Sequence, residues 1–209
     1  MATIMDPHLS LTMFLTFTAK VSTSAKMTYV KQLKTSEYSP AIDYYKDLRT
    51  PIKNVLKSDQ PINRIADVVE TVRTEKRANY SRCIQKFIKF YNSYDSVEYF
   101  DTGSANWTIP NTISISSSPE FGLILNGQKY LIKAYYKKPN STTKVTKRNI
   151  ESMLTLMDSA NYSFSTNDCK IAVLNLQNGK LIIGSPASEN KILQLKIDAQ
   201  NLANIWNAV

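Results

Sequence analysis

The segment 121–137, FGLILNGQKYLIKAYYK, gives the clearest indication of the fold. Two apolar runs flank Asn126-Gly127, a dipeptide that strongly favours a two-residue β-hairpin turn. We therefore expect antiparallel strands over 121–125 and 129–137. Side chains alternate across a strand, so the return strand has two different faces. One face carries Tyr130, Ile132, Ala134 and Tyr136, and the other carries Leu131, Lys133, Tyr135 and Lys137.

The chain on the carboxyl side of this hairpin alternates between helix and strand patterns. Residues 145–160 have apolar side chains at helical spacing, and residues 192–206 close the chain with a second such pattern. Between them, the runs 170–176 and 180–183 flank another turn, which ends at Gly179. This region therefore predicts a helix, a second hairpin and a final helix.

The chain on the amino side of the hairpin is mostly helical up to about residue 92. The clearest helix covers 80–91, where apolar residues recur at i, i+3, i+4, i+7, i+8 and i+11. A first short helix is expected over 11–18. Ser39-Pro40 is a typical helix start, and Pro51 should kink or split the helix that begins there.

These patterns together predict an α+β fold. A helical amino-terminal half is followed by a mainly antiparallel sheet of about five strands in hairpins, with helices packed on one side. Residues 112–116 alternate as a strand does and supply the first strand, after a turn at 101–104. We expect a single domain over 1–209, in which a helical lobe over 9–77 adjoins an α+β core over 78–209.

The composition leaves the class of partner open. The formal net charge is +9 for 209 residues, which is explained either by solubility or by an anionic partner such as nucleic acid. No apolar run is long enough to span a membrane, and the stretch Leu9–Phe17 is interrupted by polar residues. We expect a basic, cytoplasmic protein that has no membrane contact and no cofactor.

Histidine and cysteine are too scarce for several classes of catalytic and metal site. His8 is the only histidine, which argues against a Ser-His-Asp or Cys-His mechanism and against a multi-histidine metal site. Cys83 and Cys169 form no CxxC motif, so the sequence predicts no structural zinc site. We expect two buried thiols. Whether they form a disulfide is left open by the sequence, because only their geometry in the fold decides it.

The region between Lys129 and Arg148 contains six lysines and one arginine but no acidic residue. It combines the return strand with the start of the next helix, so the charge lies on ordered elements and favours a fixed anion-binding surface. The helix over 80–91 adds a second basic row. The candidate anion-binding residues are Lys133, Tyr135, Lys137, Lys144, Lys147, Arg148, Arg82 and Lys86. The alternative is that these side chains are simply solvated.

The order helix, three strands, helix, strand over residues 78–176 is similar to the core of the restriction-endonuclease-like nucleases. In that family an acidic residue precedes a strand that carries Asp/Glu-x-Lys, and the carboxylates hold Mg²⁺. Glu120 stands where the first acid would be, but the return strand offers Lys133-Ala134-Tyr135 and no second carboxylate. The resemblance therefore implies a nucleic-acid-binding protein that has lost cleavage, because Mg²⁺ sites rely on carboxylate oxygens.

Four short segments also resemble an uncharacterised family of bacterial proteins of about this length. The matching segments are 119–123 (PEFGL), 132–137 (IKAYYK), 44–49 and 76–80. The resemblance covers most of the chain, and it implies a shared fold and a bacterial source. It implies no function.

Three hypotheses for the function follow. The first is a non-catalytic protein that binds an anionic partner, nucleic acid above all, on the basic surface. The second is a protein-interaction or structural role, with a protein partner or a second copy and no ligand chemistry. The third is a degenerate or metal-dependent nuclease, which requires its side chains to converge. Its catalytic residues would be Glu120, Lys133, Glu151 and Asp168. The sequence favours a protein that is not an enzyme, and it assigns no metal ligands.

Overall fold

The computed structural model describes residues 6–35, 44–58, 60–136, 146–147 and 150–209. The central hairpin forms as the sequence predicts, with β5 (Phe121–Leu125) paired antiparallel to β6 (Gln128–Tyr135). Asn126 and Gly127 connect the two strands with φ angles of 48° and 83°. Both angles are positive, as a type I′ turn requires.

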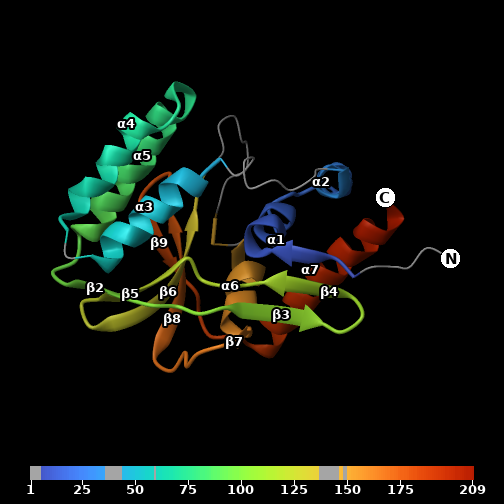
Figure 1. The fold of residues 1–209 in the computed structure, drawn as a ribbon. Coiled ribbons are helices and arrows are strands. Elements are labelled where there is room, and N and C mark those ends of the chain that lie inside the picture. The colour runs from blue at the N-terminus through green and yellow to red at the C-terminus, as the bar shows by residue number, and fades with distance from the viewer. Residues whose placement is uncertain (1–5, 36–43, 59, 137–145, 148–149) are drawn as a thin grey trace.

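β6 is the central strand of a five-stranded sheet with the order β2-β5-β6-β8-β9 (Figure 1). β2 covers Val97–Phe100, β8 covers Cys169–Asn175 and β9 covers Lys180–Ile183. β6 and β8 run parallel, because the chain crosses between them through α6 (Glu151–Asp158). The second predicted hairpin forms between β8 and β9, but the sheet is mixed and is not built from hairpins alone.

A second sheet has four strands in the order β1-β4-β3-β7. They are β1 (His8–Ser10), β3 (Ala105–Ile109), β4 (Ile113–Ser116) and β7 (Asn161–Tyr162). The expectation of one sheet is therefore wrong, because the strand predicted at 112–116 belongs to this second sheet. β1 pairs parallel with β4, so this sheet is mixed too. Strands as short as β1 and β7 carry no periodicity from which a sequence could predict them.

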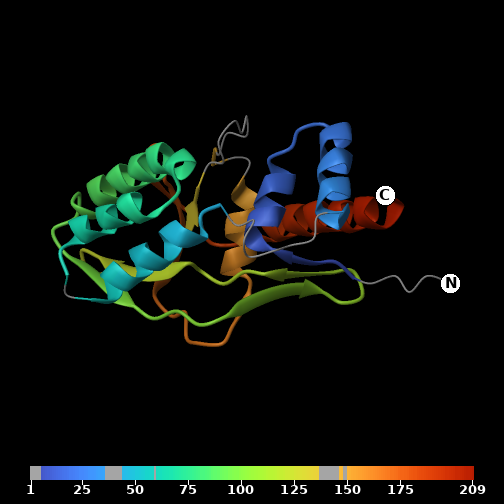
Figure 2. The same cartoon turned by 45° about the horizontal axis from the view of Figure 1, so that its top comes forward.

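Helices cover both faces of the five-stranded sheet, which corrects the expectation of helices on one side (Figures 1 and 2). One face carries α3 (Lys46–Lys57), the 3₁₀ helix η2 (Ile62–Asp67), α4 (Val68–Thr71) and α5 (Thr74–Tyr91). The other face carries α6, α7 (Glu189–Ala208), α1 (Leu11–Thr18), α2 (Thr23–Thr35) and the second sheet. Helices are thus not confined to the amino-terminal half.

The side chains of β6 alternate between two faces, as the sequence predicts, but both faces contribute to hydrophobic cores. The expectation that the face of Leu131 and Tyr135 forms a basic surface is wrong for these two residues, because helices pack on that side as well. Ile132 and Ala134 join the core beneath α3 and α5. Leu131 and Tyr135 join the core on the opposite face. Because β6 contributes side chains to both cores, the sheet separates the two cores, and each core depends on the position of the same strand.

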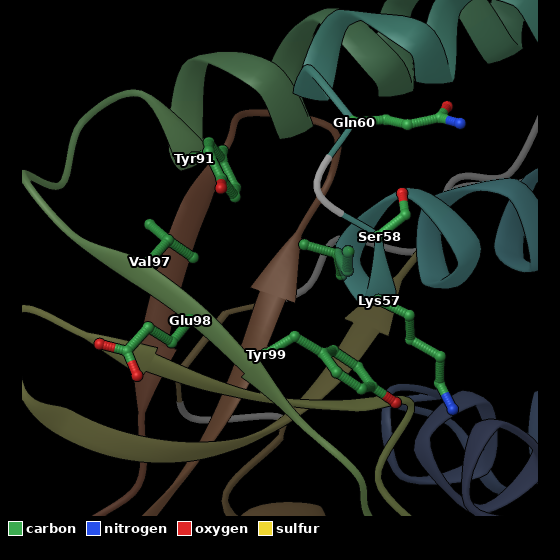
Figure 3. A pocket seen from close by; sticks show the side chains of 8 residues that line it. Lys57, Ser58, Gln60, Tyr91, Val97, Glu98 and Tyr99 are labelled. Atoms are coloured by element: carbon green, nitrogen blue, oxygen red, sulfur yellow. The ribbon is translucent and has the colours of Figure 1, made fainter.

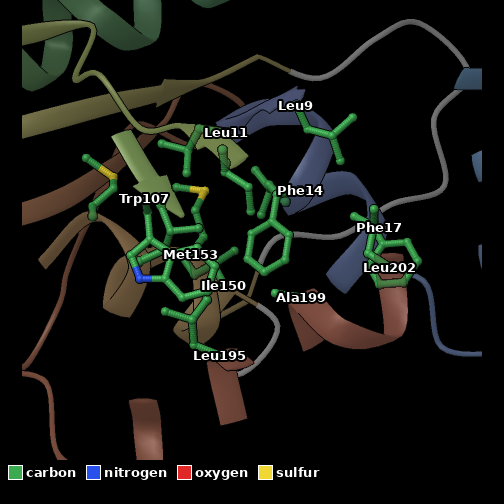
Figure 4. Close-up of a cluster of buried hydrophobic side chains, with 14 of the residues drawn as sticks. Leu9, Leu11, Phe14, Phe17, Trp107, Ile150, Met153, Leu195, Ala199 and Leu202 are labelled. Atoms are coloured by element: carbon green, nitrogen blue, oxygen red, sulfur yellow. The ribbon is translucent and has the colours of Figure 1, made fainter. Parts of the chain in front are cut away.

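The second core brings together elements that are far apart in the sequence. Phe14 of α1, Trp107 of β3, Met153 of α6 and Leu202 of α7 all lie in it (Figure 4). The predicted helical lobe over 9–77 therefore contributes α1 and α2 to this core and α3, η2 and α4 to the other one. The division of the chain into domains stays a prediction.

The predicted helices are confirmed with different limits. The helix expected over 145–160 is observed as α6, and the final helix extends beyond 192–206 to Glu189–Ala208. Pro51 lies inside α3 but does not split it. It is the sixth residue of the helix, so the helix continues there without the one backbone hydrogen bond that proline cannot donate. The predicted start at Ser39-Pro40 falls outside the described residues. In the part of the chain that the structure describes, no helix has the length and apolarity needed to cross a bilayer.

Candidate functional site

The carboxyl ends of β6 and β8 lie at the same end of the sheet as the start of β5. Glu120 directly precedes β5, and its backbone N–H donates to the Ile132 carbonyl at 2.8 Å. Its carboxylate Oε2 accepts the N–H of Ala134 at 3.3 Å. The side chain of Glu120 thus extends the β5–β6 ladder by one hydrogen bond. The carboxylate is held at the carboxyl end of a parallel strand pair, where α/β proteins commonly bind ligands.

Four side chains meet at this carboxylate, and we call them the Glu120 cluster: Glu120, Lys133, Arg49 and Tyr136. Lys133 Nζ lies 3.4 Å from Oε2 and Arg49 Nε lies 3.6 Å from Oε1. Tyr136 Oη donates to Oε1 at 3.1 Å. The Glu120 side chain is 10% exposed, compared with 19% for Lys133 and 33% for Arg49. The cluster therefore holds two cations and one carboxylate in a largely shielded place.

Tyr136 stays protonated in this environment. Burial raises the pKa of Tyr136 well above its ordinary value, and the negative charge and hydrogen bond of Glu120 raise it further. Its ring stacks on that of Tyr45, with centroids 4.8 Å apart and planes inclined by 25°. The phenol is thus oriented by its ring so that its hydroxyl donates to Glu120.

A chain of polar contacts connects Tyr45 with α5. Asn79 Nδ2 donates to Tyr45 Oη at 2.6 Å, and Arg82 donates to Asn79 Oδ1. Burial is the main cause that raises the pKa of Tyr45. The predicted anion-binding residue Arg82 therefore reaches the Glu120 cluster through two intermediate side chains, not by direct contact.

The structure places the other predicted anion-binding residues in different surroundings. Tyr135 is buried on the opposite face of β6 from Tyr136, in the second core. Lys86 lies beneath the β8–β9 turn, because Gly179 packs against its backbone carbonyl. Lys147 is exposed. Three further predicted residues lie outside the described part of the chain, namely Lys137, Lys144 and Arg148.

The carboxylates proposed for a nuclease have separate partners. Glu151 forms an ion pair with Lys191 at 2.9 Å, while Glu120 pairs with Lys133 and Arg49. The backbone carbonyl of Asp168 accepts a hydrogen bond from Gln128. Among the described residues there is no group of three or more His, Cys, Asp or Glu side chains that could hold a metal ion. Glu120, Glu151 and Asp168 thus form no shared metal-ligand group.

Arg49 is the cluster residue that sequence reasoning misses. It lies in the first turn of α3, four residues after Tyr45, which directly precedes the helix and whose carbonyl accepts the Arg49 N–H at 3.0 Å. Residues four apart at a helix start lie on the same side. That four-residue spacing was the signal available in the sequence. The sequence near Arg49 does not reveal its ion-pair partner, because Glu120 lies far along the chain.

Both cysteines are free thiols. Cys83 is buried as expected, and burial raises its pKa to about 11. Cys169 is only partly buried, and burial raises its pKa as well. A raised pKa disfavours the thiolate, so neither cysteine has the character of a reactive nucleophile.

No known family model matches the chain, and no curated protein matches its sequence.

Proposed function

We propose that this protein binds the phosphate backbone of nucleic acid without cleaving it. The supporting observation is that Lys133, a residue of the basic run 129–148, and Arg49 are held in fixed positions by Glu120 at the carboxyl end of β6. Fixed cations at a sheet end attract phosphate oxygens more effectively than mobile ones, because less side-chain entropy is lost on binding. A bacterial source and a cytoplasmic location belong to the same proposal.

The absence of cleavage in this proposal rests on what surrounds Glu120. Lys133 and Arg49 already occupy both oxygens of its carboxylate. A Mg²⁺ ion at this carboxylate would therefore face two positive charges, and hard cations of this kind require several oxygen ligands. The cluster is better suited to neutralising an anion than to holding a metal.

The connectivity of the five-stranded sheet supports the resemblance to the restriction-endonuclease-like core. The elements follow one another as α5, β2, β5, β6, α6 and β8, with the β3–β4 hairpin inserted after β2. Glu120 precedes β5, where the resemblance would place the first acid, and Lys133 of β6 lies beside it. Lys133 stands where the resemblance would place the second acid, and Tyr135 stands where it would place the lysine. A shared nucleic-acid-binding ancestry is part of the proposal.

The test is fluorescence anisotropy of labelled single- and double-stranded DNA and RNA, measured at about 50 and 200 mM salt. Phosphate contacts should make the affinity at least about tenfold weaker at the higher salt concentration. The informative variant is Lys144→Glu/Lys147→Glu, which changes two lysines of the basic run and none of the four residues of the Glu120 cluster. Lys133→Glu is unsuitable because it would place a second carboxylate against Glu120.

The matched control is Lys170→Glu/Lys196→Glu, which makes the same charge change at two exposed lysines of β8 and α7. We expect the Lys144/Lys147 variant to lose about tenfold or more in affinity and the control to lose much less. Equal losses in both variants would assign binding to net charge alone. An affinity that does not change between the two salt concentrations would refute the proposal.

A further inference from the structure

A pocket of about 400 Å³ lies beside β2, between the carboxyl ends of α3 and α5 (Figure 3). Its lining includes Lys57, Gln60, Tyr91 and three consecutive residues of β2, namely Val97, Glu98 and Tyr99. Neighbouring side chains of a strand point to opposite faces. Three consecutive residues can therefore border one hollow only if the backbone edge of the strand borders it.

The backbone groups at this edge lack a partner strand. Among the described residues β2 pairs only with β5, at the edge of the sheet. The N–H of Asn126 donates to the Ser96 carbonyl at 3.0 Å. In an antiparallel ladder every second residue hydrogen-bonds to the partner strand, so this bond shows which residues of β2 face β5. By this alternation Glu98 hydrogen-bonds toward β5, and the N–H and C=O groups of Val97 and Tyr99 point to the open side.

The side chains next to Tyr99 in the pocket wall are held in place by contacts within the protein itself. Tyr99 Oη donates to Asp101 Oδ1 at 2.9 Å, and Lys57 Nζ lies 2.6 Å from the same oxygen. The Lys57 ammonium also lies 5.4 Å from the centre of the Tyr99 ring. Because Asp101 balances Lys57, the pocket offers no uncompensated cation, and a phosphate is a poor occupant.

We propose that β2 binds an extended peptide, which adds to the sheet as a further strand and places one uncharged side chain in the pocket. The outward groups of Val97 and Tyr99 match the backbone of an extended peptide, since strand addition uses alternate N–H and C=O groups. The hydroxyl of Tyr91 and the amide of Gln60 suit an amide or phenol side chain in the pocket. This site is separate from the Glu120 cluster and does not depend on nucleic-acid binding.

The proposal is tested with labelled, acetylated heptapeptides of the form Thr-X-Thr-X-Thr-X-Thr, in which X is Gln, Tyr, Glu or Lys. We expect the Gln or Tyr peptide to bind more tightly than the Glu and Lys peptides. Amide hydrogen exchange of the full chain, followed by NMR, should show new protection at Val97 and Tyr99 when that peptide is bound. The amides of Leu181 and Ile183, which point outward at the opposite edge strand β9, should be unaffected.

Proline provides a matched pair of variants. Val97→Pro removes an outward N–H without removing a hydrogen bond to β5, and proline is tolerated at such edge positions. Ile183→Pro makes the same change on β9. We expect peptide affinity to fall about tenfold in Val97→Pro and to stay unchanged in Ile183→Pro.

Protection of Val97 and Tyr99 in the wild-type protein supports the proposal even if Val97→Pro fails to fold. Failure of all four peptides to bind below about 1 mM overturns it, since weaker binding would be worth no more than about 4 kcal/mol. Binding that protects other amides, or that survives in Val97→Pro, overturns it as well. Neither result bears on nucleic-acid binding, because the anisotropy test uses different residues.

Discussion

Glu120 is the residue whose carboxylate balances two cations that are both mostly withdrawn from water. Removing its charge leaves Lys133 and Arg49 without this anionic partner and leaves Tyr136 with at most a neutral amide oxygen as acceptor. Breaking a buried pair typically costs about 3–5 kcal/mol, whereas an exposed pair is worth about 1 kcal/mol or less. The partial exposure of Arg49 places this cluster between the two cases.

We therefore expect Glu120→Gln to lower the free energy of unfolding by about 2–4 kcal/mol. The measurement is urea denaturation followed by circular dichroism. Glu98→Gln is the control, because Glu98 is exposed and takes part in no ion pair within the described residues. It should change stability by about 0.5 kcal/mol or less. A similar effect of both variants would show that the cluster contributes nothing specific.

Tyr136 should affect how the stability of the protein depends on pH under alkaline conditions. Its folded-state pKa is raised well above the ordinary value of 10.0, so the native state holds this proton more tightly than the unfolded state. The stability that results is fully present below pH 10 and is lost as the pH rises toward the folded-state pKa. Tyr136→Phe has no such proton, so its free energy of unfolding should fall less steeply than that of the wild type above about pH 10. Parallel pH profiles would contradict this expectation.

At the scale of elements, the contact between β2 and β5 depends on a glycine. Gly122 of β5 lies opposite Phe100 of β2 in the antiparallel register. A Cβ atom added to Gly122 would lie 2.5 Å from two atoms of the Phe100 ring. The phenyl ring therefore covers the glycine, and any larger residue at this position must move it.

Gly122→Ala should destabilise the protein by about 1–3 kcal/mol, as overpacking usually does. Adding Phe100→Leu should remove part of this cost, because the smaller side chain makes room for the new methyl group. The measurement is a double-mutant cycle by chemical denaturation. Additive effects of the two substitutions would mean that the ring contact is not the cause.

At the scale of the whole molecule, the five-stranded sheet lies between two hydrophobic cores. Leu48 of α3 is fully buried in one core and Leu202 of α7 in the other. β6 and β8 send alternate side chains into both cores. Loss of packing on one face should therefore weaken the strands that support the other face.

We expect Leu48→Ala and Leu202→Ala each to cost about 2–5 kcal/mol and to shift one common unfolding transition. Thermal unfolding should be followed by near-UV and far-UV circular dichroism, which report on packing and on backbone structure. Two separate transitions, each moved by one of the substitutions, would show that the cores unfold independently. That result would also divide the chain into two cooperative units.

Sequence patterns predict the elements whose determinants are adjacent in the chain, and they miss the elements that depend on distant partners. The β5–β6 hairpin is predictable because Asn126-Gly127 and its flanking apolar runs are adjacent in the chain. The alternation of Leu131, Ile132 and Tyr135 between two faces follows from strand geometry alone. β1 and β7 are missed because their pairing partners lie far away, and nothing within a two- or three-residue strand specifies them.

The candidate site divides in the same way. Lys133 and Glu120 can each be singled out from the sequence, as a lysine within an apolar strand and an acid before one. Their pairing, the arrival of Arg49 from α3 and the burial of Tyr136 depend on how α3 packs on the sheet. The amino-acid sequence specifies local conformation, because periodicity and turn chemistry act over a few residues. The charge cluster, the second sheet and the open edge of β2 arise only in the folded chain, because each requires contacts between residues far apart in sequence.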